Sequence, residues 1–329
     1  MLNNALAKVG ALFLLVFAVT CEAYEIIPSE SALPIMRGAG MPRIRSAEVL
    51  NNNQQQLNLN TFVHSNAIDS GSQNETLIID GETRGLELVY RTGLTEKLEF
   101  AVAASWLNHS AGGLDSLIEG WHDAFSLSDG DRDLFEEDQL LFRYQQGAKV
   151  TEVTQRQNGI SDTQVSLAYR LNQTQPSDLF LSMRAGVNLP TGDPDKATGS
   201  DKVDANLGIA ASGQFFANKT WSWAAYLGYL YISDDELFGI STKHHNWFTS
   251  ADLVWHASER WSWQIQLSGH SALFETEIDE LKDEAWQISF ASEYQFKNPR
   301  RSIRVYFSED ISVNASPDFA FGVAFKFDL

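Results

Sequence analysis

The sequence predicts an all-β fold: a transmembrane antiparallel up-and-down β-barrel of about 12 strands with an extracellular helical insertion. Three observations predict it: alternating apolar and polar residues in many short segments, a secretory leader, and connections that alternate between short and long. The alternation is clearest at residues 321–329, where apolar side chains occupy the odd positions and small or charged ones stand between them. A period of two gives a strand one apolar face and one polar face.

The end of the chain carries a first resemblance. The last residue is the apolar Leu329, and Phe327 and Phe325 lie two and four residues before it. This ending resembles the terminal strand that addresses Gram-negative barrels to the outer membrane, although Leu329 stands where Phe or Trp is commoner. The resemblance implies that the barrel-assembly machinery is a partner through this strand.

The start of the chain predicts export through a cleaved signal peptide, residues 1–23. Lys8 precedes an apolar run from Val9 to Val19, and small residues surround a cut after Ala23. A run of about eleven apolar residues is a secretory core, because a spanning helix needs roughly twenty. Acylation of Cys21 is a rival interpretation, but the residues before it fit lipoprotein cleavage poorly.

The amino-acid composition restricts the molecules that the protein can bind and the cell compartment that it can occupy. The formal net charge is −19, so the protein will not bind nucleic acid, whose phosphates require Lys and Arg. The 20 Phe, 9 Trp and 9 Tyr suit a membrane barrel, whose strands need only alternate. The expected location is the Gram-negative outer membrane, and the expected partners include its lipid and lipopolysaccharide.

Twelve segments are predicted to be strands, and their connections alternate in length. Short connections suit the periplasmic side and long acidic ones the outside, counted back from a periplasmic C-terminus. The predicted strands are near 55–66, 84–93, 97–109, 162–172, 178–189, 204–216, 221–232, 246–257, 261–269, 286–296, 301–310 and 318–329.

Residues 55–329 are expected to form the barrel, and two segments lack its strand pattern, one inside this range and one before it. Residues 110–161 are expected to be an extracellular insertion with a helix around 114–127 and a hairpin near 140–155. Residues 24–54 are punctuated by Pro and Gly and are locally basic. They are expected to be either a plug inside an acidic lumen or a periplasmic tail.

The insertion carries a second resemblance, to a family of uncharacterised Gram-negative outer-membrane proteins known only as a domain of unknown function. The matching stretches are residues 80–83, 113–122, Phe125 and 129–132, and the likeness spreads from about Pro34 to Leu329. The resemblance implies a barrel and supplies no catalytic residues. Residues 186–193 are similar to the strand-to-loop edge of several uptake barrels.

The predicted helix of the insertion has an apolar stripe that includes Trp121, with Asp115, Glu119 and His122 on its flank. Glu119 and His122 have the spacing used in carboxylate-bridged metal sites, but those sites need ligands from further helices. We therefore expect a helix that caps the barrel mouth and no metal site.

Parity along the strands predicts which side chains line the lumen. Among the charged and polar ones we single out Asp252, His270, Arg184, Glu293, Arg304 and Lys326. Charges of both signs predict little ion selectivity. His64 and Ser65 suggest a membrane-embedded lipid hydrolase, but neighbours in a strand face opposite ways and cannot act as base and nucleophile together.

The sequence therefore favours a narrow or gated channel for a small solute that it does not identify. The alternatives are a structural or binding barrel without transport and a lipid hydrolase. No catalytic residue and no cofactor is predicted.

Overall fold

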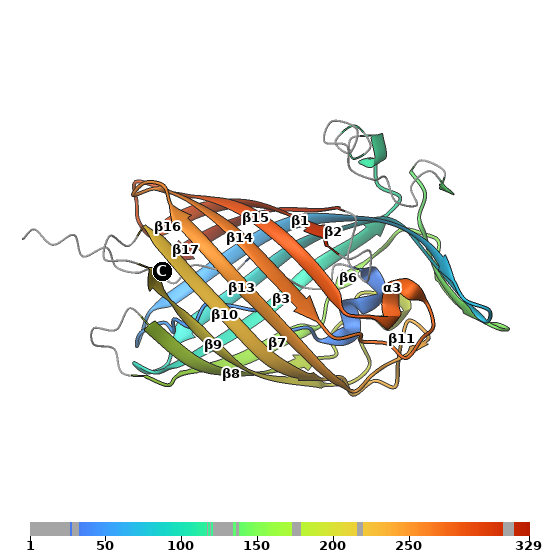
Figure 1. The fold of residues 1–329 in the computed structure, drawn as a ribbon, viewed down its shortest axis with the longest axis horizontal. Helices are drawn as coiled ribbons and strands as arrows, with labels where there is room; N and C mark the ends of the chain where they lie inside the picture. The colour runs from blue at the N-terminus through green and yellow to red at the C-terminus, as the bar shows by residue number, and fades with distance from the viewer. Residues whose placement is uncertain are drawn as a thin grey trace, which may run out of the picture.

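The computed structural model describes residues 27, 33–116, 118, 120, 134–135, 138–172, 179–215, 220–311 and 319–329. Twelve of their strands form one closed antiparallel barrel, because β1 pairs with both β2 and β17 (Figure 1). The barrel strands are β1 (Gln55–Gly71), β2 (Glu75–Gly93), β3 (Leu98–Ser110), β7 (Thr163–Arg170), β8 (Leu179–Leu189), β9 (Asp204–Phe215), β10 (Trp221–Tyr231), β13 (His245–His256), β14 (Trp261–His270), β15 (Ala285–Gln295), β16 (Arg301–Asp310) and β17 (Phe319–Asp328).

The barrel is inverted relative to a water-soluble protein: its wall is apolar outside and polar inside. Strand β14 shows the pattern, since Trp263 and Ile265 are 52% and 39% exposed while Gln264 and Gln266 are 7% and 0% exposed. An outer surface of this kind suits lipid, and the polar interior suits water or charged groups. The predicted twelve-stranded barrel is thus confirmed.

The first hairpin is longer than the sequence predicted. β1 and β2 run on to Gly71 and back from Glu75, and a second hairpin, β4 (Leu141–Gln146) and β5 (Lys149–Val153), pairs with this extension of β2. The extra hairpin near 140–155 is therefore confirmed. A short strand, β6 (Gln157–Ile160), continues the pairing on β3.

Large inward aromatic rings lie over glycines of the neighbouring strand. Phe248 is paired with Gly228 and Phe62 with Gly85, and a Cβ at either glycine would overlap the ring. The same arrangement joins Tyr306 to Gly322. Such pairs let a bulky ring lie flat against the wall, so they leave room inside the barrel.

The two ends of the barrel differ. At the turn end, short turns lie beside the C-terminus; at the other, the loop end, long connections carry small elements (Figure 1). These elements are η3 (Pro194–Lys196), β11 (Glu236–Leu237), β12 (Ile240–Ser241) and α3 (Asp279–Lys282). A further short helix, η1 (Pro34–Ala39), precedes β1 and lies at the same end (Figure 1). None of the helices in the described part of the chain is long and apolar enough to cross a membrane.

Candidate functional site

The lumen is occupied by residues 33–54 of this chain, which we term the N-terminal segment. Its helix η1 lies at the loop end, near α3, and the rest runs through the barrel to β1 at the turn end (Figure 1). Most of residues 33–49 are buried. The wall therefore encloses protein where an open pore would hold water.

Side chains of the wall bind the backbone of the N-terminal segment. Arg184 on β8 donates through Nη2 to the carbonyl oxygens of Ser46 at 2.5 Å and Glu48 at 3.2 Å. Arg170 on β7 donates to the carbonyl of Val49 at 2.7 Å, and Gln164 to that of Met41 at 2.6 Å. Contacts with carbonyl groups hold the chain path without depending on the side chains of the segment.

Arginines of the segment bind acceptors on the wall in turn. Arg37 lies 2.7 Å from Nδ1 of His64, Arg43 pairs with Glu87, and Arg45 lies 3.5 Å from Glu99. Each acceptor projects inward from β1, β2 or β3. Buried carboxylates need such partners, since an isolated ionised group in a low-dielectric interior is strongly destabilising.

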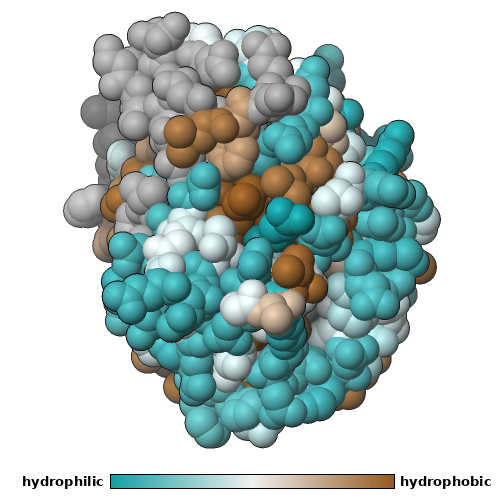
Figure 2. Space-filling view, turned by 90° about the vertical axis from the view of Figure 1, so that its right-hand side faces the viewer, coloured by the Kyte–Doolittle hydropathy of each residue, from teal (hydrophilic) through white to brown (hydrophobic). Residues whose placement is uncertain are grey.

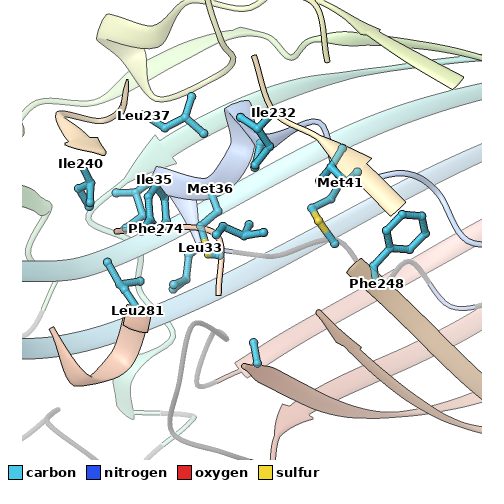
Figure 3. Packing of buried hydrophobic residues seen from close by; sticks show 14 of the residues in the cluster. Leu33, Ile35, Met36, Met41, Ile232, Leu237, Ile240, Phe248, Phe274 and Leu281 are labelled. Carbon is cyan, nitrogen blue, oxygen red and sulfur yellow. The ribbon is translucent and has the colours of Figure 1, made fainter. Parts of the chain in front are cut away.

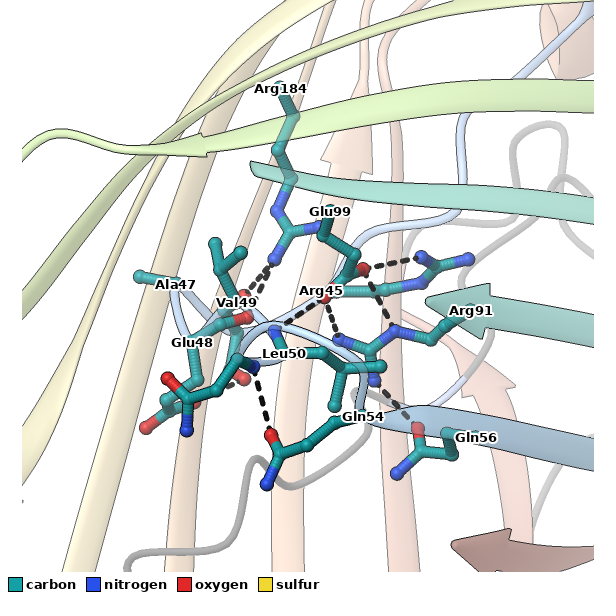
Figure 4. A network of polar contacts seen from close by, with 12 residues as sticks. Arg45, Ala47, Glu48, Val49, Leu50, Gln54, Gln56, Arg91, Glu99 and Arg184 are labelled. Atoms are coloured by element: carbon teal, nitrogen blue, oxygen red, sulfur yellow. Dashed lines mark hydrogen bonds and ion pairs between the residues drawn. The ribbon is translucent and has the colours of Figure 1, made fainter. Parts of the chain in front are cut away.

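Glu99 is the centre of a polar network between the wall and the segment (Figure 4). Its side chain is 1% exposed and accepts two hydrogen bonds of 2.9 Å from Arg91 and one of 2.9 Å from the backbone N–H of Leu50. Arg45 adds the weaker contact already described. The network joins β2 and β3 to the segment, so it links barrel closure to segment binding.

The predicted lumen residues fall into separate groups. Arg304 donates to Glu293 at 2.5 and 3.0 Å, and Lys326 lies 3.9 Å from the other oxygen of Glu293. These three residues come from β15, β16 and β17 and fasten neighbouring strands to one another. Arg184 belongs instead with the segment.

Asp252 and His270 lie apart from those groups. Gln264 donates to Asp252 at 2.8 Å, and Nδ1 of His270 lies 2.8 Å from the carbonyl of Ser271. Both side chains are 6% exposed. The predicted set therefore does not converge on a single centre.

Ile27 is a second point of contact with the wall, farther from β1 along the chain. Gln266 accepts from the N–H of Ile27 at 2.8 Å and donates to its carbonyl at 2.9 Å, and both residues are 0% exposed. Ile27 also packs with Ala291 and Tyr306. Because Gln266 lies within β14, Ile27 too lies inside the lumen.

The loop end is sealed by an apolar cluster that we term the mouth cluster. It packs Leu33, Ile35 and Met36 of the segment against side chains from several long loops (Figure 3). The loop side chains are Ile232, Leu237, Ile240, Leu273, Phe274, Ile278 and Leu281. In the view of this end, apolar residues gather near the centre of the face, with hydrophilic residues below them and to their right (Figure 2).

Charged loops border the mouth cluster. Lys202 donates to Asp235 at 2.9 Å, and this hydrogen bond lowers the pKa of Asp235. Burial raises the pKa of the neighbouring Asp234, which accepts from the N–H of Lys202 at 3.2 Å. In the part of the chain that the structure describes, no three His, Cys, Asp or Glu side chains are grouped to hold a metal ion.

The cavities described beside the segment are small. The cavity bounded by Arg43, Arg45, Glu87, Arg304 and Lys326 has a volume of about 50 Å³. Two other cavities beside the segment, one near Arg184 and one near His64, have about 20 Å³ each. Spaces of this size hold one to a few water molecules and are too small for a solute.

The start of the insertion is helical. Asp115, Ser116, Ile118 and Gly120 have helical backbone. Glu82 on β2 accepts hydrogen bonds of 2.7 Å from the N–H groups of Gly113 and Leu114, which open this helix. Asp115 accepts from the N–H of Asp138 at 3.0 Å. Glu119, Trp121 and His122 lie outside the described residues, as does the predicted signal peptide, residues 1–23.

His64 and Ser65 do not form a base and nucleophile pair. The ring of His64 stacks on Phe62, with centroids 4.7 Å apart, and binds Arg37. Sequence reasoning missed another contact, in which Ser222 Oγ lies 2.8 Å from Nε2 of His256 inside the lumen. No carboxylate among the described residues is hydrogen-bonded to His256, so the pair lacks the group that orients a catalytic imidazole.

Comparison with known proteins identifies a family and a fold. The sequence matches the family described as "Protein of unknown function (DUF3187)" over residues 11–329. No curated protein matches it. The COG4313 outer membrane channel from Pseudomonas putida F1 is similar in structure, with a TM-score of 0.55 and 14% identity, over 86% of this chain and 98% of that one.

Two further solved structures are similar at lower scores. The NanC porin has a TM-score of 0.48 and 10% identity, over 83% of this chain and 100% of that one. A FadL homologue from Pseudomonas aeruginosa has a TM-score of 0.42 and 9% identity, over 93% of this chain and 99% of that one. The likeness to the Pseudomonas putida channel shows that the fold is that of a bacterial outer-membrane barrel.

Proposed function

The chain belongs to the DUF3187 family, and from that premise we propose that it is a narrow channel for a small solute, closed at rest by its own N-terminal segment. The channel lies in the Gram-negative outer membrane after removal of residues 1–23. The turn end faces the periplasm and the loop end faces outward, in agreement with the short and long connections of bacterial barrels.

One observation carries this proposal: the wall binds both the backbone and the arginines of the segment, and the cavities described beside it have volumes of about 50, 20 and 20 Å³. While the segment is in place no solute can pass. Its displacement uncovers a lumen lined by charged and polar side chains, which is a wet path across the membrane.

The hydrogen bonds of Arg184 and Arg170 favour a removable segment. A wall that only needed filling could use its own bulky apolar side chains, as small barrels do. Here the inward aromatic rings lie flat over glycines, and the freed space is taken by a segment attached at one end to β1. A tethered element in a wet lumen is suited to gating.

A disulfide lock tests the proposal. The N–H of Ala47 donates to Ser212 Oγ on β9 at 3.1 Å, so the two positions are neighbours across the contact between segment and wall, and cysteines at both form the lock. The only native cysteine is Cys21, within the predicted signal peptide. Refolded wild type should give discrete current steps in planar bilayers. Oxidised Ala47→Cys/Ser212→Cys should be silent and should recover its current steps after reduction.

Each single-cysteine variant is the control for the lock. Equal current from the oxidised and reduced double variant would contradict gating by the segment. Silence of the wild-type barrel under all conditions would favour the second candidate, a structural barrel. The ion-paired group of Glu293, Arg304 and Lys326 favours the structural barrel, because it joins neighbouring strands and needs no solute to pass.

We also propose that the insertion, residues 110–161, extends the helix that begins at Asp115 and covers the mouth. In this proposal Asp115, Glu119 and His122 form the polar flank and Trp121 is the apolar anchor. Trp121→Ala should raise the conductance or the frequency of opening. Unchanged currents would remove the insertion from the gating mechanism and leave the N-terminal segment as the gate.

A further inference from the structure

An open groove of about 470 Å³ lies beside the barrel where β2, β3 and β6 meet toward the loop end. It is distinct from the lumen, and most of its lining belongs to the first and last residues of the insertion, residues 110–161. The groove is lined by Arg84, Asn108, Ser110, Ala111, Gly112, Leu140, Thr154 and Arg156.

The charge of this lining is opposite to that of the whole protein. Its described residues include two arginines and no acid, in a chain of net charge −19. Arg84 has a side chain that is 53% exposed, and Arg156 is exposed as well. Two outward arginines on one concave surface favour an anion.

The partners of the two arginines leave donors free for a ligand. Arg84 donates through Nε and Nη2 to one oxygen of the buried Glu82, at 3.1 and 2.8 Å, so Nη1 makes none of these bonds. Arg156 donates through Nη2 to the amide oxygen of Asn108 at 3.2 Å. A separate ion pair, Arg143 with Glu152, belongs to the β4–β5 hairpin.

The strand register places the groove next to the apolar band. Arg84 is paired with Asn108, and both side chains face outward. The next outward row toward the turn end is Leu86, Trp106 and Ile160, which are cross-strand partners and are each 50% exposed. Trp at such a boundary is typical of the level of lipid headgroups.

We propose that this groove binds the phosphate group of a phosphorylated lipid, lipid A of the outer leaflet. The guanidinium groups of Arg84 and Arg156 and the amide of Asn108 hold the phosphate, and the acyl chains lie along Leu86, Trp106 and Ile160. A free phosphate ion would use the same arginines but would gain nothing from the apolar row. The combination of the two surfaces therefore specifies a lipid.

Native mass spectrometry of the refolded full chain in detergent tests the proposal. The probes are bisphosphorylated lipid A, the same lipid without phosphates, and inorganic phosphate. Wild type should retain one phosphorylated lipid and should bind the dephosphorylated lipid at least about tenfold more weakly, the factor expected for one lost charge-assisted hydrogen bond. Millimolar inorganic phosphate should displace little of the lipid.

Two variants and one control test which residues form the lipid site. Arg156→Gln leaves the Arg84–Glu82 pair intact and should weaken lipid retention about tenfold, and Arg84→Gln/Arg156→Gln should weaken it further. Arg143→Gln, an equal charge change on the adjacent hairpin, should leave retention unchanged. Heat-modifiable migration reports folding, and if the double variant fails to fold, Arg156→Gln alone decides.

Three results would overturn the proposal. Equal retention by wild type and Arg156→Gln would exclude the groove. Equal retention of the dephosphorylated lipid would exclude phosphate recognition. Full displacement of the lipid by millimolar inorganic phosphate would make this a site for free phosphate.

Discussion

Replacing Arg184 by Gln is the sharpest test of how the N-terminal segment is held. Arg184 is 6% exposed and donates to two carbonyls of the segment, at Ser46 and Glu48. A hydrogen bond from a charged donor contributes about 1.5 kcal/mol at the lower end of the measured range. Loss of both bonds therefore weakens segment binding by about 3 kcal/mol.

Each 1.4 kcal/mol changes an equilibrium tenfold, so the displaced population should rise by about 100-fold. The Gln side chain can keep one of the two bonds, which lowers the expected increase to about tenfold. The single-channel open probability in planar bilayers measures this population directly. The conductance of each opening should change little, because displacement of the same segment opens the same lumen.

Controls separate gating from a general change in charge or folding. Arg143→Gln removes the same charge outside the lumen, where Arg143 pairs with Glu152, and should leave open probability unchanged. Adding Ala47→Cys/Ser212→Cys to Arg184→Gln should abolish the extra openings under oxidising conditions. An open probability for Arg184→Gln equal to that of wild type, in a barrel with normal heat-modifiable migration, would refute the reasoning.

Three further predictions concern the wall, the insertion and the loop end. Gly228→Ala should drive the ring of Phe248 from the wall and destabilise the barrel by about 1–3 kcal/mol, seen as a lower temperature for the heat-induced gel shift; an unchanged temperature would contradict the close packing. Glu82→Gln should weaken both 2.7 Å hydrogen bonds to the insertion, so added protease should cleave the insertion at least severalfold faster. Cleavage at the wild-type rate would show that Glu82 does not anchor the insertion. Asp162→Ala should leave the donors of Asn188, Gly192 and Ser200 without their shared acceptor, and the urea concentration at the midpoint of unfolding should therefore fall. A midpoint equal to that of wild type would show that water replaces the carboxylate.

The barrel strands could be predicted because the alternation of apolar and polar residues that marks a strand lies within the strand itself. The predicted strand at 261–269 corresponds to β14, Trp261–His270, and 301–310 corresponds to β16, since each strand shows its two faces in its own residues. The extension of β2 to Glu75 was missed. Residues 77–79 are consecutively apolar and so lack the alternation that predicts a barrel strand. In the structure they pair with β1 along one edge and with β4 along the other.

The lumen contacts were less predictable because they join distant parts of the chain. Parity placed Arg184 on the inner face, but no pattern in the sequence specifies its bonds to Ser46 and Glu48, which lie 138 and 136 residues away. The same limit applies to Gln266 and Ile27. The pairing of Gly228 with Phe248 has a signal in hindsight, namely a glycine in a strand otherwise rich in large side chains.

In the proposed gating, the covalent link to β1 sets the direction in which the N-terminal segment leaves. Gln55 begins β1 at the turn end, so the segment pivots there and η1 must withdraw from the mouth cluster toward that end. The backbone contacts of Arg184 and Arg170 lie closer to the pivot in sequence than the apolar contacts of Leu33 and Met36 do. Withdrawal therefore costs the apolar contacts first. Met36→Ser, at a side chain that is 2% exposed, should increase brief openings, whereas Arg184→Gln should prolong them. Identical dwell times in the two variants would show that the segment leaves as one rigid unit.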